Sequence, residues 1–245
     1  MSLEASLRIG LRQFAEAEKL LAEAEGLYRA AGDSVGAAKA LLQRGTAAEY
    51  SGKSEQALAL YRRAAELLDL AAEPVLFLHS QHNQANALVD LGRTAEARAI
   101  LSSSSSEFDR HCDDVNRERR RWTAARIARA EGRFVEAVAG FDQTCNGFLS
   151  LQRPYDAALV LVDASELHLA CGHWREVKKL AGRLEAIFAV RGVHLEARKA
   201  LILFQQAVRE ERLTAEFLAR LRRYILIGRR DPRFPFDPGA GPALG

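Results

Sequence analysis

Two short segments of this 245-residue chain gather side chains that bind polar or charged ligands. The first carries His79, His82, Asn83 and Asn86, and the second carries Arg119, Trp122, Arg126 and Arg129. Spacings of three and four residues place side chains on one face of a helix. Arginine forks hold carboxylates through two parallel hydrogen bonds, and a tryptophan ring offers a flat surface to an apolar side chain or a cation. The two sets predict a surface for an anionic group; the alternative is a charged face that contacts only solvent.

A pair of carboxylates, Asp163 and Glu166, also shares one helical face. Paired carboxylates are what acid–base catalysis needs. The simpler interpretation is an acidic end of the same binding surface, opposite in sign to the arginines, which would orient a bound chain by charge.

Two further groups contain metal-ligand residue types. His79 and His82 are three residues apart without a third ligand nearby, which favours solvated or hydrogen-bonded histidines over a metal site. His168, Cys171 and His173 straddle a turn, and we expect no metal there either. The chain also has no phosphate-binding loop, nucleophile elbow or dinucleotide motif. We therefore expect neither an enzyme nor a cofactor.

A repeated turn motif indicates which elements position these residues. The motif Gly52-Lys-Ser-Glu-Gln-Ala57 has related copies that begin at Gly92, Gly132 and Gly172, each glycine 40 residues after the one before. Arginine replaces the glycine in weaker copies at Arg12 and Arg212. A fixed period of this length is typical of a solenoid of stacked supersecondary units.

The residues around each turn have the pattern of a helical hairpin. Small residues lie seven before and five after the turn position, and larger ones such as Tyr61 and Phe141 lie nine after. Small residues let two antiparallel helices approach closely, and larger ones fill the space between hairpins. The glycine allows the positive φ that ends the first helix, and Ser54 or Thr94 would cap the second.

This pattern resembles the tetratricopeptide repeat (TPR). The matching positions are Gly45, Gly52, Ala57, Tyr61 and Ala64 in one repeat, and Ala125, Gly132, Phe134, Ala137 and Phe141 in another. The period of 40 exceeds the common 34 and is similar to repeats in sensor regions of large bacterial transcription regulators. The resemblance implies an all-α, right-handed solenoid of antiparallel hairpins with about five and a half repeats.

In that family the first helix of each hairpin lines a concave groove, and the family's groove offsets select the side chains named above. Some relatives hold the C-terminal carboxylate of a peptide with Asn and Lys or Arg at similar places. Asn83, Asn86, Arg119 and Arg126 are of the same types, although His82 stands where the family has Lys. The resemblance thus implies a protein or peptide partner with acidic residues or a free C-terminal carboxylate.

Composition limits the other partners. The net charge is +3 and the isoelectric point about 8.9, too mild to indicate nucleic acid without a concentrated patch. The segment from Arg110 to Arg133 has eight arginines against four acids, but no aromatic series is interleaved with them, so nucleic-acid binding is disfavoured. No stretch has the 18 apolar residues of a membrane span. The three cysteines are odd in number and favour a reduced, cytoplasmic setting.

We expect one repeat domain over residues 1–227, with turns near 12, 52, 92, 132, 172 and 212, followed by an extended tail over 228–245. In that tail Phe234 and Phe236 would cover the last hairpin. Five serines, Ser102 to Ser106, should shorten one helix, because serine hydrogen-bonds to its own backbone; a modification site there is the alternative.

The functional interpretation is a protein-interaction module of a larger bacterial regulatory protein, which binds an extended or acidic peptide segment in its groove. Alternatives are a ligand- or peptide-sensing domain of a transcription regulator, a nucleic-acid-binding solenoid and an enzyme. The sequence indicates neither the partner nor the oligomeric state.

Overall fold

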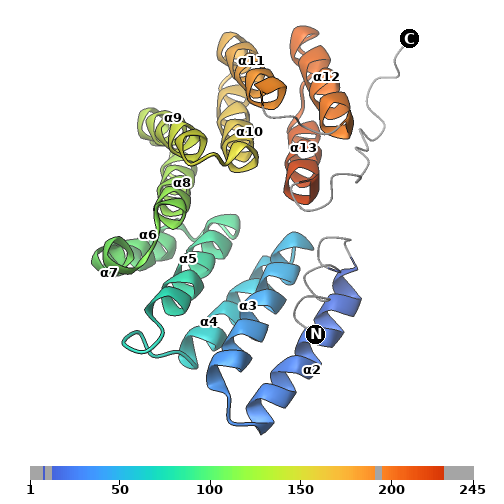
Figure 1. The fold of residues 1–245 in the computed structure, drawn as a ribbon. Helices are drawn as coiled ribbons and strands as arrows, with labels where there is room; N and C mark the ends of the chain where they lie inside the picture. The colour runs from blue at the N-terminus through green and yellow to red at the C-terminus, as the bar shows by residue number, and fades with distance from the viewer. Residues whose placement is uncertain (1–7, 9–12, 191–194, 229–245) are drawn as a thin grey trace. The chain divides into compact units, whose positions relative to one another are not determined.

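The computed structural model describes residue 8, residues 13–190 and residues 195–228. These ranges contain helices and no strands, which confirms the predicted all-α class. The helices are α2 (Phe14–Ala30), α3 (Ser34–Tyr50), α4 (Ser54–Glu66), α5 (Pro74–Asp90), α6 (Thr94–Ser103), α7 (Ser105–His111), α8 (Asp114–Ala130), α9 (Phe134–Ser150), α10 (Pro154–Ala170), α11 (Trp174–Val190), α12 (Leu195–Arg209) and α13 (Ala215–Gly228) (Figure 1).

The repeated glycines end helices as predicted. Their φ angles are 79° at Gly52, 73° at Gly92 and Gly132, and 71° at Gly172. At the first of these turns the N–H of Lys53 donates to the carbonyl oxygen of Ala48 over 2.9 Å. Such a bond around a left-handed residue satisfies a carbonyl that the helix itself leaves unpaired. Each glycine therefore forms the turn between the two antiparallel helices of a hairpin.

The last hairpin turn lies one residue from its predicted position. Between α12 and α13 the left-handed residue is Glu211, with φ 53°, not Arg212. Gln152, between α9 and α10, has φ 56°. Both turns place a side chain where the others have glycine. The turn predicted near residue 12 lies outside the described residues, as does the tail beyond Gly228 with Phe234 and Phe236.

The helix starts only partly follow the predicted capping. Proline begins α5 at Pro74 and α10 at Pro154, as expected. Ser54 and Thr94 lie inside the first turns of their helices and do not cap them, because the preceding residue occupies the cap position without a side-chain bond. Aspartate provides a cap elsewhere: Asp33 Oδ1 accepts from the N–H of Gly36 over 2.7 Å.

The helices form two compact units, the first ending at Arg133 and the second beginning at Phe134. In the first unit each helix from α2 to α6 packs against the next, and the first helices of successive hairpins, α3, α5 and α8, also touch (Figure 1). A continuous apolar core runs between α3, α4, α5 and α6. Its arrangement follows the nearest-neighbour stacking of a solenoid.

A close helix contact in this core depends on the small residue that the repeat pattern predicts. Tyr61 on α4 is fully buried against Gly45 on α3, and a methyl group at Gly45 would lie 2.3 Å from the tyrosine ring. The Tyr61 hydroxyl donates to Glu49 Oε2 over 2.7 Å. Burial, and then the Glu49 charge, raise the pKa of Tyr61 well above its usual value. The ring is therefore fixed at both ends.

The serine run interrupts a helix, as expected. α6 ends at Ser103 and α7 begins at Ser105. The hydroxyl groups of Ser103 and Ser104 both bond to the carbonyl oxygen of Ile100, at 3.1 and 2.8 Å. These side-chain bonds compete with the helical ladder and explain the break. The short α7 then packs its buried Phe108 against α5.

The second unit is not a simple continuation of the stack. α9, α10, α11 and α12 pack in succession, but α13 packs against α10 as well as against α12. The four helices α10 to α13 thus close into a ring of contacts. Within this ring α10 also contacts α9, and every residue of α10 from Asp156 to Ser165 is buried. None of the helices in the described ranges combines the length and apolar character that crossing a bilayer requires.

Candidate functional site

The structure brings the two predicted polar sets together. α5 and α8 are in contact, and the eight side chains lie between the buried and the exposed classes. We call this surface the α5–α8 face: His79, His82, Asn83, Asn86, Arg119, Trp122, Arg126 and Arg129. Half-burial of eight polar or aromatic side chains means that most of the face is held in place by neighbours rather than extended into solvent.

Asn86 is the centre of the hydrogen bonds on this face. Its Oδ1 accepts from Thr123 Oγ1 over 2.9 Å and from Arg126 Nη1 over 3.1 Å. Arg126 also forms an ion pair with Asp90 at the end of α5. Two donors converge on one amide oxygen, so the orientation of Asn86 is fixed. Arg126 therefore joins α8 to α5.

This orientation fixes the proton position on His82. Asn86 Nδ2 lies 3.0 Å from His82 Nε2. Because an amide nitrogen can only donate, Nε2 accepts and the ring proton is on Nδ1. That Nδ1 is buried and has no hydrogen-bond partner among the described residues. Burial first, and then the charge of Arg119, lower the pKa of His82 to about 3.

His79 has a similar environment. Burial first, and then Arg119, lower its pKa, and its Nε2 is buried without a hydrogen-bond partner in the described part of the chain. Both histidines are therefore neutral at pH 7. The positive charge of the α5–α8 face comes from its arginines alone. Arg119 Nη1 donates to Asn116 Oδ1 over 3.2 Å, which orients its guanidinium along α8.

The two predicted acidic residues lie in the second unit, and one of them is not on a solvent-facing surface. Asp163 is fully buried, and its carboxylate forms an ion pair with Arg222 of α13. Glu166 is half-buried. Asp163 was expected to form the acidic end of the groove, but it is buried because α13 covers this part of α10. The sequence period alone could not show that.

No metal-ligand cluster of three or more His, Cys, Asp or Glu residues occurs within the described ranges. The rings of His168 and His173 are 5.8 Å apart, with Cys171 in the turn between them. Buried Cys145 has its pKa raised to about 11, chiefly by burial. A thiol with so high a pKa is a poor nucleophile at neutral pH.

Comparison with solved structures identifies the fold. The structure is similar to two crystal structures of TPR-like repeats of a putative kinesin light chain from Podosopora anserina, with TM-scores of 0.56 and 0.54 and 20% identity. The matches cover 76% of this chain and 91% and 92% of those chains. This is a TPR-type repeat fold. No protein-family model and no curated protein matches the sequence.

The two exposed arginines on the outer side of α8 are paired with acids. Arg117 pairs with Asp114 and Arg121 with Glu118 on α8 itself. Arg120 points to the opposite side, where it donates to the carbonyl oxygen of Leu101 over 2.7 Å and lies over the Phe108 ring. Such pairing lowers the net field available to a polyanion. It does not favour a nucleic-acid interface on this side of α8.

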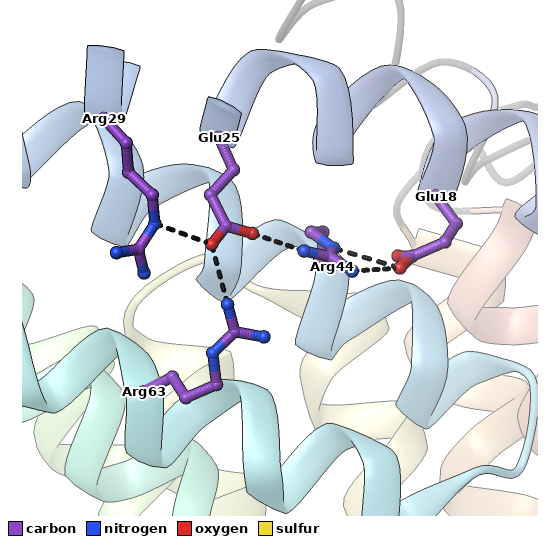
Figure 2. A network of polar contacts seen from close by, with 5 residues as sticks. All are labelled: Glu18, Glu25, Arg29, Arg44 and Arg63. Carbon is purple, nitrogen blue, oxygen red and sulfur yellow. Dashed lines mark hydrogen bonds and ion pairs between the residues drawn. The ribbon is translucent and has the colours of Figure 1, made fainter. Parts of the chain in front are cut away.

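A charge network in the first unit was not predicted from the sequence. Glu25 on α2 is buried, and its carboxylate contacts Arg29, Arg44 of α3 and Arg63 of α4 (Figure 2). Arg44 also donates to Glu18. A buried carboxylate needs such partners, because an unpaired charge in the interior is costly. The network therefore fixes the register of three successive helices. Arg29 lies four residues after Glu25 on α2, but Arg44 and Arg63 come from the next hairpin, so no local spacing indicated their contacts with Glu25.

Proposed function

We propose that this protein is a protein-interaction module that binds an acidic peptide segment on the α5–α8 face. TPR-type solenoids present extended surfaces to other proteins, and the fold is typically a non-enzymatic scaffold. The observation that supports the site is the convergence of three arginines and a tryptophan from α8 with the donor-rich side of α5.

Charge supports an acidic partner. The face-forming positions of α8 carry three arginines and no acid, and both histidines of α5 are neutral. A carboxylate beside Arg119 would gain a charge-assisted hydrogen bond, and Trp122 would pack an apolar neighbour of that carboxylate. A free C-terminal carboxylate and an acidic side chain offer the same chemistry.

The wider context is also a proposal. A non-enzymatic module within a larger bacterial regulatory protein of the cytoplasm is supported only by the 40-residue repeat form and the cysteine content. A ligand-sensing role in a transcription regulator would use the same surface.

The test uses fluorescent 12-residue peptides with zero to six acidic residues, each with a free and an amidated C-terminus. We expect fluorescence anisotropy to show affinity rising with acidic content. Arg119→Glu with Arg129→Glu should weaken binding at least tenfold, because one charge pair is worth about 1.4 kcal/mol or more when partly desolvated. Arg126 is left intact, because it holds Asn86 and Asp90.

The matched control is Arg117→Glu with Arg121→Glu, which changes the net charge equally on the exposed side of α8. It should bind the peptides as the wild type does. If both double variants lose affinity alike, the attraction is unspecific and the assignment to the α5–α8 face is wrong. If the wild type binds the free peptides but not the amidated ones, the terminal carboxylate is the recognised group.

A further inference from the structure

The C-terminal helix α13 covers the side of α10 on which the groove positions were expected. Asp163 of α10 is fully buried, and Arg222 of α13 donates to both of its carboxylate oxygens. Leu159 and Glu166 lie one turn to either side of Asp163 on the same stripe, and Leu159 is 1% exposed. The equivalent positions of α5 in the first unit stay partly exposed, as do Arg119 and Arg126 of α8, whereas Thr123 of α8 is buried. In the second unit the chain itself fills this surface.

α13 has the residue pattern of a helix that binds in a groove. Leu218, Arg222 and Ile225 are spaced by four and three residues, so they form one stripe. Leu218 is 0% and Ile225 1% exposed. Leu218 and Ile225 suit the apolar surface of α10, and Arg222 between them pairs with Asp163 on that surface. Helix-in-groove recognition uses this spacing of anchors.

The contact between α10 and α13 is specific without being purely apolar. A buried ion pair contributes less to stability than apolar packing of the same volume, but it strongly penalises a partner that lacks the matching charge. Asp163 thus selects for a helix that carries a cation in this register. On its other side α13 stacks Phe217 on Phe204 of α12, with ring centroids 6.4 Å apart.

We propose that α13 is an internal ligand of α10, and that the surface it covers binds an external amphipathic helix with an arginine in the register of Arg222. A tethered helix has an effective concentration of about a millimolar, so it outcompetes a weak external helix and yields to a strong one. This second-unit site is separate from the acidic-peptide site on the α5–α8 face.

The test titrates a fluorescent peptide of residues 213–228 with the full-length chain. The peptide should bind the wild type weakly, because α13 occupies the site. Arg222→Glu places a carboxylate against Asp163, weakens the internal contact and should raise peptide affinity at least tenfold. Arg223→Glu, an equal charge change at an exposed neighbour, should not. A peptide that itself carries Arg222→Glu should fail to bind either variant.

Hydrogen exchange distinguishes opening from unfolding. In Arg222→Glu we expect faster amide exchange in α13, with α9, α10 and α11 still protected. Faster exchange in all of these helices would show that α13 is an integral core helix and would overturn the proposal. An intact second unit without a gain in peptide affinity would overturn it as well.

Discussion

At the scale of single residues, Gly45 and Tyr61 offer the most direct test of the packing. Alanine at Gly45 should lower the free energy of unfolding by about 1–2 kcal/mol, because its methyl group would lie 2.3 Å from a ring that cannot move. The cost of this steric overlap is expected to exceed the gain of about 1 kcal/mol that alanine brings to a helix. Urea unfolding, followed by Trp122 fluorescence in a Trp174→Phe background, measures the change in the first unit.

Gly26→Ala is the control for this substitution. Gly26 is also helical, and nothing lies within 4 Å of its added methyl group. Gly26→Ala should raise the free energy of unfolding by up to about 1 kcal/mol. Equal gains at both glycines would mean that Tyr61 can shift, and that the predicted close contact has no energetic role.

His82 should make stability depend on pH. Its folded pKa is lowered to about 3 from 6.5, so below pH 6.5 the unfolded chain binds a proton that the folded chain does not. Stability therefore falls on acidification from pH 6.5 toward 3, with a slope of up to about 1.4 kcal/mol per pH unit for one proton. His82→Gln should flatten this slope between pH 7.5 and 5. Urea midpoints at several pH values test this, and parallel curves for His82→Gln and the wild type would contradict it.

At the scale of elements, the left-handed turns explain what the sequence could predict. Glycine is the only residue that adopts this conformation without strain, so the four glycines located their hairpins to the residue. Gln152 and Glu211 adopt it against their own preference, because the packed helices on both sides impose the geometry. No local pattern indicates such positions. The turn near Arg212 was accordingly displaced by one residue.

Replacing Gln152 by glycine should raise the stability of the second unit by about 0.5–1 kcal/mol, because glycine removes the cost of a left-handed side-chain residue. Gln143→Gly, in the exposed interior of α9, should lower it by about 1 kcal/mol. Urea unfolding followed by Trp174 fluorescence in a Trp122→Phe background measures both. A loss of stability at Gln152 would show that its side chain has a stabilising contact.

At the scale of the whole molecule, the 40-residue period predicted the helices and their order but not all of their neighbours. Helices adjacent in sequence pack against each other from α2 to α7 and from α9 to α13, because short turns hold them side by side. The contact of α13 with α10 joins segments separated by two other helices, and it includes the ion pair of Arg222 with Asp163, which no repeat period indicates. The α5–α8 face could be predicted from the sequence, because it is formed by the first helices of two successive hairpins, which the period places side by side.

The closed ring of α10 to α13 has a mechanical consequence. Stretched from its ends, an open row of hairpins peels apart one neighbour at a time, since each contact borders only the next. The ring offers no such free end, because α13 is bound to α10 on one side and to α12 on the other. Under force, α2 to α5 should extend in small successive steps, whereas α10 to α13 should give way in one larger event.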